Sequence, residues 1–303
     1  MNIKVNNPLS NSLIAGEFTK CLLCNNQTLL PLKNYQQAHL IKCAKCGFVF
    51  SRLIPTVPAL IAHYNTYPRT DTISPITLKR FNELCTYFER FRDTGNILDV
   101  GCGNGHFLAV AKMHGWNVFG TEYTDIAMAI CKQKGIEMHQ GKLDTSFFID
   151  TKFDVITSFE VLEHINNPME EVANFNELLR SNGIVYVTTP NFNSLSRHYL
   201  NQKWNIIEYP EHLSYYTPFT ITRLFHTIGF LPLNIKTTGI SLTRFQQSSG
   251  HMTSASDVKK MDENLREKTE NNPFFAAIKK LANNTLTLTG TGDTIKAIFK
   301  KQV

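Results

Sequence analysis

A glycine-rich turn contains the residues with the clearest chemical role. Residues 96–105 read N-I-L-D-V-G-C-G-N-G, a short apolar strand that passes into a turn. Its glycines can adopt positive φ angles and leave room for a ligand against the backbone. Asp99 lies just before the turn, and Glu122 ends the next apolar run, where a carboxylate can hold the hydroxyls of a ribose. The three glycines that complete this predicted nucleotide-type site are Gly101, Gly103 and Gly105.

Four cysteines form a second constellation. Their spacing is C-x2-C…C-x2-C, a strong pattern for a tetrahedral zinc ion. A module this small buries little core, so the metal is expected to supply folding energy. Because sulfur fills all four positions, we predict a structural rather than a catalytic zinc. The alternative is that these residues are four unrelated buried cysteines. They are Cys21, Cys24, Cys43 and Cys46.

Two histidines lie where a general base is useful. His164 follows the strand predicted over residues 153–159, and His212 lies in the long segment 192–217. A neutral imidazole at either place can take a proton from a hydroxyl group. We predict His212 as the first candidate and His164 as the second, and a purely structural role stays open for each.

Segment 192–217 is too long for a simple connection. We predict that it forms the part of the site that binds the second substrate, which we call the acceptor. It contains P-E-H-L-S-Y-Y-T-P, which offers a carboxylate, an imidazole and two phenols. We predict that Trp204, Glu211 and Tyr215 contact the acceptor. The aromatic rings suit stacking on a sugar as well as on an aromatic ring, so they leave the acceptor open.

Strands and helices alternate after residue 92. Apolar runs predict strands over residues 97–100, 116–122, 136–139, 153–159, 184–191, 231–242 and 292–300. Helical periodicity predicts helices between them, over residues 107–113, 125–131, 169–179 and 221–230. This alternation, with the glycine turn first, predicts an α/β, Rossmann-like, doubly wound sheet that is mainly parallel.

The composition is that of an ordinary globular enzyme. The 303 residues are 42% hydrophobic and 18% charged, and the net charge of +6 permits an anionic partner without requiring one. No apolar run approaches the roughly 20 residues of a membrane span. The first residues lack the features of a signal peptide. We therefore expect a cytoplasmic protein whose seven cysteines are thiols or metal ligands rather than disulfides.

The motifs D-V-G-C-G-N-G, G-T-E and E-V-L-E-H resemble those of class I S-adenosylmethionine-dependent methyltransferases. P-E-H-L-S-Y-Y-T-P resembles a bacterial group that acts on glycans and secondary metabolites. The resemblance implies S-adenosylmethionine as cofactor and a seven-stranded mixed sheet whose last strand is antiparallel. It implies further cofactor contacts from Tyr123, Phe159 and Asp144, the last at the adenine. Asp144 fits a helix cap equally well.

The chain divides into three predicted parts. These are a zinc-binding module over residues 1–54, a helical linker or lid over 55–92 and a methyltransferase domain over 93–303. A helical insertion is predicted at about residues 247–284. Three residues before the first strand are candidates to cover the cofactor, or to cap the junction: Tyr64, Tyr67 and Arg69.

The predicted activity is methyl transfer from S-adenosylmethionine to a small-molecule or glycan acceptor, with a hydroxyl as the favoured group. The alternatives are a sugar carbon methyltransferase, a zinc-containing ribosomal RNA methyltransferase and an inactive binding protein with this fold. Nucleic acid is disfavoured as a partner because the cysteine segment has few basic residues: Lys33, Lys42 and Lys45. The sequence leaves the acceptor, the base and the oligomeric state open.

Overall fold

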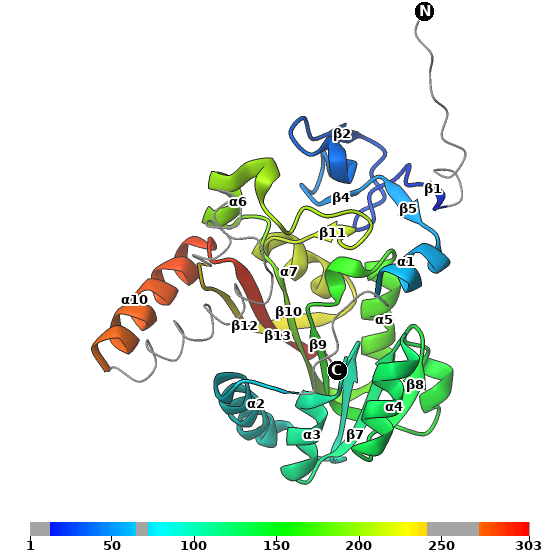
Figure 1. Ribbon diagram of the computed structural model, residues 1–303, viewed down its shortest axis with the longest axis vertical. Helices are drawn as coiled ribbons and strands as arrows, with labels where there is room; N and C mark the ends of the chain where they lie inside the picture. Colours follow the sequence, from blue (N-terminus) through cyan, green and yellow to red (C-terminus); the bar gives the residue numbers. More distant parts are fainter. Residues whose placement is uncertain (1–12, 65–71, 241–272, 303) are drawn as a thin grey trace, which may run out of the picture.

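A seven-stranded sheet forms the centre of the molecule in the computed structural model, which describes residues 13–64, 72–240 and 273–302 (Figure 1). Its strands are β6 (Asn96–Val100), β7 (Asn117–Glu122), β8 (Glu137–Gln140), β9 (Phe153–Phe159), β10 (Leu179–Pro190), β12 (Phe230–Thr238) and β13 (Thr294–Lys301). The order is β12-β13-β10-β9-β6-β7-β8. Only β13 runs antiparallel to its neighbours. The predicted mixed, doubly wound sheet is therefore confirmed.

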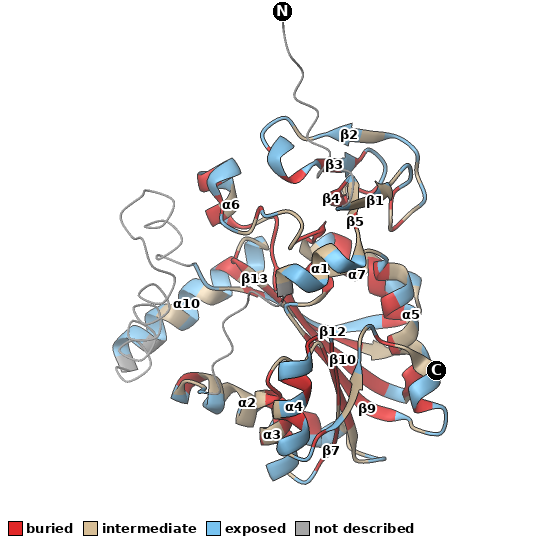
Figure 2. Ribbon diagram, turned by 45° about the vertical axis from the view of Figure 1, so that its right-hand side comes forward, coloured by how far each residue is buried: buried red, intermediate tan, exposed pale blue. Residues whose placement is uncertain are grey.

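Helices cover both faces of this sheet. Consecutive residues of a strand point to opposite faces, and Ile97 packs toward one helical layer while Leu98 packs toward the other. The first layer contains α2 (Pro75–Phe88), α3 (His106–Met113) and α4 (Asp125–Gln133). The second contains α5 (Pro168–Leu178) and α7 (Pro218–Thr227). Burial is concentrated along the central strands between the layers (Figure 2).

The cysteine segment forms a second sheet that is completed from far along the chain. Its own strands are β2 (Leu29–Pro31), β3 (Leu40–Cys43) and β4 (Val49–Ser51). The fourth strand is β11 (Ser214–Tyr215), which pairs antiparallel with β4 and places Ser214 opposite Phe50. β1 (Ile14–Glu17) and β5 (Leu53–Pro55) form a separate two-stranded sheet. The sequence did not predict the pairing of β4 with β11.

The core of the cysteine segment is shared with the large domain. The Phe48 and Phe50 rings are buried and stack with their centroids 5.5 Å apart. Phe48 also lies 5.3 Å from the ring of Tyr216, which directly follows β11. Of residues 48–50, which were predicted to pack beneath the cysteines, Phe48 and Phe50 do so, whereas Val49 packs in the cluster that contains Trp204. The segment therefore depends on the acceptor side for part of its core.

Several remaining elements differ in length from their predicted ranges. α1 (Val57–Tyr64) and α2 confirm helices before the first strand, whereas Tyr67 and Arg69 lie outside the described residues. α6 (Leu195–Leu200) lies within segment 192–217. α10 (Pro273–Thr289) extends beyond the predicted end of the helical insertion at about residue 284, and the first part of that insertion is outside the described residues. Every helix among the described residues is too short or too polar to cross a bilayer.

Candidate active site and cysteine cluster

The glycine turn and Glu122 meet at the carboxyl ends of β6 and β7. Glu122 is 9% exposed, and its Oε2 atom accepts a hydrogen bond of 3.1 Å from the backbone N–H of Gly103. Its Oε1 atom accepts a bond of 3.0 Å from the N–H of Tyr123. These bonds hold the carboxylate beside the turn, where ligands of open α/β sheets bind.

Two glycines of the turn are required for different reasons. Gly101 has φ of 69°, and an added Cβ there would lie 2.6 Å from Cγ2 of Val161. Gly103 has φ of 53°, and an added Cβ would have no heavy atom within 4 Å. Packing therefore explains Gly101, whereas Gly103 borders open space in which a ligand can approach the backbone.

Asp99 lies inside the sheet rather than on its edge. It is 2% exposed, and its Oδ1 atom accepts a hydrogen bond of 2.7 Å from the hydroxyl of Thr157 on β9. Burial raises the pKa of Asp99 to about 8. Asp99 therefore supports the turn from beneath, and its predicted contact with a cofactor stays a prediction.

The other predicted cofactor residues surround the same edge of the sheet. The Phe159 ring packs 5.1 Å from the Phe107 ring. Tyr123 is 36% exposed at the end of β7. Asp144 accepts a bond of 2.9 Å from the N–H of Ser146 as the cap of a 3-10 helix, and the Ser146 hydrogen bonds lower its pKa. The cap role is thus observed, and the adenine role stays a prediction.

His164 and His212 lie side by side, although their positions in the sequence do not indicate this. Their ring centroids are 4.9 Å apart. Nδ1 of His164 lies 2.7 Å from the carbonyl oxygen of Glu211, and Nδ1 of His212 lies 2.7 Å from that of Ile206. A carbonyl oxygen only accepts, so each Nδ1 carries a proton, and in the neutral form of either ring the lone pair is at Nε2. Burial and the neighbouring His212 lower the pKa of His164 to about 4.

Glu163 lies beside the histidine pair and is not among the candidate residues predicted from the sequence. It is 2% exposed, its Oε2 atom accepts a bond of 2.9 Å from Thr189, and its Oε1 atom is 4.0 Å from Nε2 of His164. Burial raises the pKa of this carboxyl well above its usual value. The E-V-L-E-H motif contains Glu163, but its spacing alone does not show that the carboxyl turns inward.

The positions of Trp204 and Tyr215 contradict the prediction that these two side chains contact the acceptor. They are 1% and 3% exposed and pack in one cluster with Tyr35 and Val49 of the cysteine segment. Tyr215 is also part of β11. The two rings therefore fill the core between the loop and the cysteine sheet and do not offer a face to an acceptor. Tyr215 reaches His212 only through its hydroxyl, which donates a bond of 3.2 Å to the backbone carbonyl oxygen, whereas a carboxylate oxygen of Glu211 lies 3.9 Å from Nε2 of His212.

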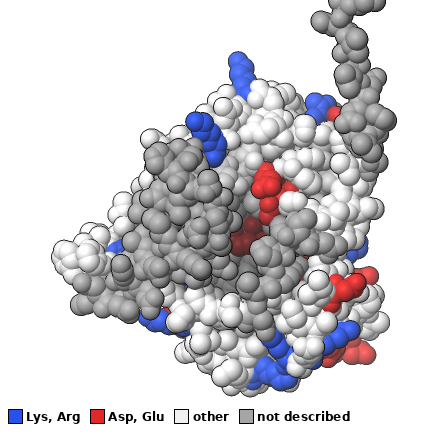
Figure 3. Space-filling model, viewed as in Figure 1, with Lys and Arg blue, Asp and Glu red and all other residues white. Residues whose placement is uncertain are grey.

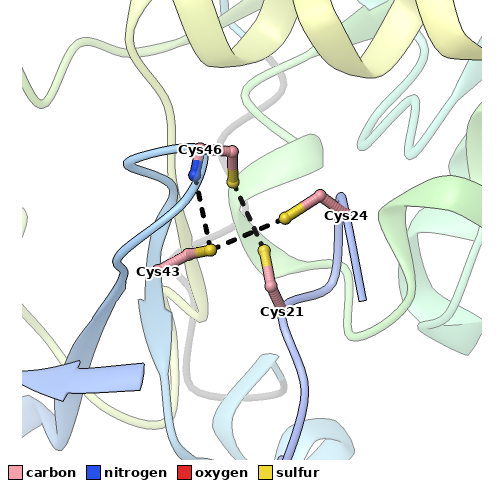
Figure 4. A group of neighbouring side chains, drawn as sticks. All are labelled: Cys21, Cys24, Cys43 and Cys46. Atoms are coloured by element: carbon pink, nitrogen blue, oxygen red, sulfur yellow. Dashed lines mark hydrogen bonds between the residues drawn. The ribbon is translucent and has the colours of Figure 1, made fainter. Parts of the chain in front are cut away.

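The four cysteines converge from two turns (Figure 4). The Sγ atoms of Cys21 and Cys46 are 3.4 Å apart, and those of Cys24 and Cys43 are 3.6 Å apart. All four sulfurs lie within 4.8 Å of one another. A tetrahedral ion with Zn–S bonds of about 2.3 Å separates its sulfurs by about 3.8 Å. The four residues therefore fit a zinc ion with small adjustments.

Backbone donors surround the cysteine sulfurs. The N–H of Leu23 lies 3.4 Å from Sγ of Cys21, and the N–H of Cys46 lies 3.5 Å from Sγ of Cys43. Burial alone would raise the pKa of Cys43, but the backbone N–H groups of Cys46 and Lys45, together with the Cys24 and Cys46 side chains, lower it to about 6. Burial raises the pKa of Cys46 to about 11 and that of Cys21 further. A bound cation would offset this cost of burying thiolates.

A family comparison decides the assignment of the large domain. A model described as a methyltransferase domain matches residues 77–234, just over half of the chain. The chain belongs to the methyltransferase domain family. The matched range contains the glycine turn, Glu122 and the histidine pair.

Individual relatives agree with this family. The chain is 31% identical over 106 residues to a ubiquinone biosynthesis O-methyltransferase of Actinobacillus pleuropneumoniae, covering 31% of this chain and 45% of that protein. It is 32% identical over 102 residues to the protein of that name from Nitrosococcus oceani, covering 31% and 43%. The chain thus spans less than half the length of these relatives.

A solved structure supports the fold. A crystal structure described as a sarcosine dimethylglycine methyltransferase from Galdieria sulphuraria matches with a TM-score of 0.50 and 14% identity. The match covers 75% of this chain and 84% of that one. At this identity the likeness concerns the class I methyltransferase fold alone.

Proposed function

We propose that this protein transfers a methyl group from S-adenosylmethionine to a hydroxyl of a small molecule. The observation that carries the proposal is the meeting of three features at one sheet edge: the glycine turn, the buried Glu122 carboxylate and the histidine pair. The names of the curated relatives favour oxygen as the acceptor atom. They favour a small molecule over the glycan acceptor that the sequence also suggested.

Each residue has a distinct task in this mechanism. Glu122 would hold the ribose hydroxyls of the cofactor, and the turn at Gly103 would let the cofactor lie against the backbone. The bound sulfonium supplies an activated methyl group, so the protein contributes mainly proximity and orientation. His212, with Nδ1 fixed on Ile206, would take the hydroxyl proton at Nε2. His164 is a weaker candidate for the base than His212, because burial lowers the pKa of His164 to about 4.

The cysteine cluster would hold one structural zinc ion. Its four sulfurs leave no open position for a substrate, so its contribution is to folding. Through β3, β4 and β11 it would also support the loop that carries His212.

Native mass spectrometry and a turnover assay test the proposal together. We expect one zinc and one S-adenosylmethionine per chain, and formation of S-adenosylhomocysteine with a panel of hydroxyl-bearing acceptors. His212→Asn should retain cofactor binding and lose about 10²–10⁴-fold in kcat, the usual worth of a general base. His164→Gln should lose less.

A different result would favour another role. A protein that holds zinc and fails to bind S-adenosylmethionine at millimolar concentration would contradict the proposal and indicate a binding protein with a methyltransferase fold. Unchanged kcat in His212→Asn, with a normal pH profile, would exclude His212 as the base.

A further inference from the structure

A second group of charged side chains lies beside the histidine pair and is not used in the mechanism above. It joins His63 of α1 to two carboxylates of the acceptor loop, Glu208 and Glu211. Nε2 of His63 is 3.5 Å from Oε2 of Glu211, and one potential ligand atom of each of the three residues lies within 4.8 Å of the others. On the face of the molecule shown in Figure 3, acidic side chains gather near the middle, and some of them are recessed.

The backbone fixes the two carboxylates on one turn. The N–H of His212 donates a hydrogen bond of 2.8 Å to the carbonyl oxygen of Glu208, closing the turn that contains both glutamates. The carbonyl oxygen of Glu211 lies 2.7 Å from Nδ1 of His164. These bonds therefore fix the backbone from which both carboxylate side chains extend.

The two carboxylates are unfavourably close to each other without a cation. Partial desolvation of the carboxyl group raises the pKa of Glu208, and so does the adjacent Glu211 through charge repulsion and a shared hydrogen bond. Two imidazoles lie near the Glu211 carboxylate, with Nε2 of His63 at 3.5 Å and Nε2 of His212 at 3.9 Å. A divalent cation would let both carboxylates ionise and would accept the Nε2 lone pair of His63.

We propose that His63, Glu208 and Glu211 bind a divalent cation. One imidazole and two carboxylates suit Mn²⁺ or Fe²⁺, in contrast to the thiolate cluster, which favours zinc. Three protein ligands leave coordination positions for water or an acceptor oxygen. Glu208 is exposed and the other two residues are half-buried, so a ligand can reach the cation from outside.

The cation would lie beside the proposed base. Oε1 of Glu211 is 3.9 Å from Nε2 of His212, so a hydroxyl bound to the cation would be near that imidazole. The cation would lower the pKa of the hydroxyl, and His212 would take its proton. This consequence rests on the proposed methyl transfer, whereas the binding of the cation does not.

Titration with Mn²⁺, monitored by electron paramagnetic resonance and water proton relaxation, tests the site. The experiment uses the full chain loaded with zinc, without cofactor or acceptor. We expect one Mn²⁺ per chain with exchangeable water. His63→Gln and Glu208→Gln should each weaken binding about tenfold or more. Glu137→Gln is the matched control, because Glu137 lies 3.8 Å from His139 in a similar pair without a second carboxylate.

Two results would overturn the proposal. One is no Mn²⁺ binding at millimolar concentration. The other is binding that survives His63→Gln and Glu208→Gln and is lost in His164→Gln, which would assign the cation to the inner histidine pair. Because the cofactor is absent from the titration, either result leaves the methyl transfer proposal to its own mass spectrometry test.

Discussion

At the scale of single residues, carboxyl groups in two environments define the candidate cofactor site. Glu122 accepts backbone hydrogen bonds at the edge of the sheet, whereas Asp99 is enclosed between strands with Thr157 as its partner. The first arrangement holds a carboxyl group at the edge of the sheet, where it can meet a ligand. The second favours a protonated carboxyl that supports the fold.

Glu122→Ala should weaken S-adenosylmethionine binding by about 10- to 100-fold, the usual worth of hydrogen bonds to a charged group. The variant also removes the acceptor of the Gly103 N–H. Isothermal titration calorimetry measures the change. Glu122→Gln keeps that acceptor and is expected to bind with intermediate affinity. Equal affinity in all three proteins would remove Glu122 from the cofactor site.

Asp99 makes stability depend on pH. Its pKa is about 8 in the folded protein and 3.8 without burial, so between these values the folded state binds a proton that the unfolded state has lost. The free energy of unfolding therefore falls as pH rises from about 4 to 8. Asp99→Asn removes this contribution. In thermal unfolding, the Tm of the variant should therefore increase relative to that of the unchanged protein as pH rises. Glu163 and Glu171 have raised pKa values too, so some slope remains in both proteins. A constant difference in Tm from pH 5 to 8.5 would contradict the assignment.

At the scale of elements, the pairing of β4 with β11 links the cysteine cluster to the acceptor loop. The N–H of Ser51 donates a bond of 2.8 Å to the carbonyl oxygen of Leu213, and the N–H of Leu213 donates one of 2.7 Å to that of Glu163. Hydrogen bonds thus continue from the cysteine sheet to the histidine pair.

Zinc removal should loosen this pairing. Chelation of the metal, or Cys43→Ser, is expected to speed amide hydrogen exchange at Ser51 and residues 213–215, while β6 and β9 stay protected. Exchange followed by mass spectrometry measures this. Cys85→Ser is the control, because Cys85 is buried in α2 outside the cluster. Unchanged exchange after zinc loss would show that packing alone holds the loop.

The sequence predicted the large sheet well and the small one poorly, for physical reasons. β6 and β9 are buried on both faces along almost their whole length, so each leaves a continuous apolar run in the sequence. β11 has two residues, too few for any period, and its partner lies far away in the chain. Likewise, an aromatic residue such as Trp204 has the same sequence signature in a loop whether it faces a ligand or a core.

At the scale of the whole molecule, the predicted division at residue 54 does not coincide with a division of the core. One buried cluster contains Cys43 and Phe50 together with Leu98 and Val185 of the central sheet. Removing residues 1–54 would expose the faces of Tyr215 and Tyr216 that contact this segment.

A chain that starts at residue 55 should therefore be less stable than the full chain. Burying a large side chain contributes roughly 1.5–3 kcal/mol, and several lose their partners here. We expect a Tm lowered by several degrees or insoluble protein, measured by thermal unfolding at matched concentration. A truncated chain with an unchanged Tm would show that the methyltransferase domain folds independently.

The β4–β11 pairing also has a consequence for synthesis on the ribosome. β4 emerges well before β11 has been translated, and at 5–20 residues per second the delay is on the order of ten seconds. During this interval the sheet that carries Cys43 lacks its fourth strand. Metal capture can then precede completion of the active site, so zinc supply during translation would govern how much newly made protein matures.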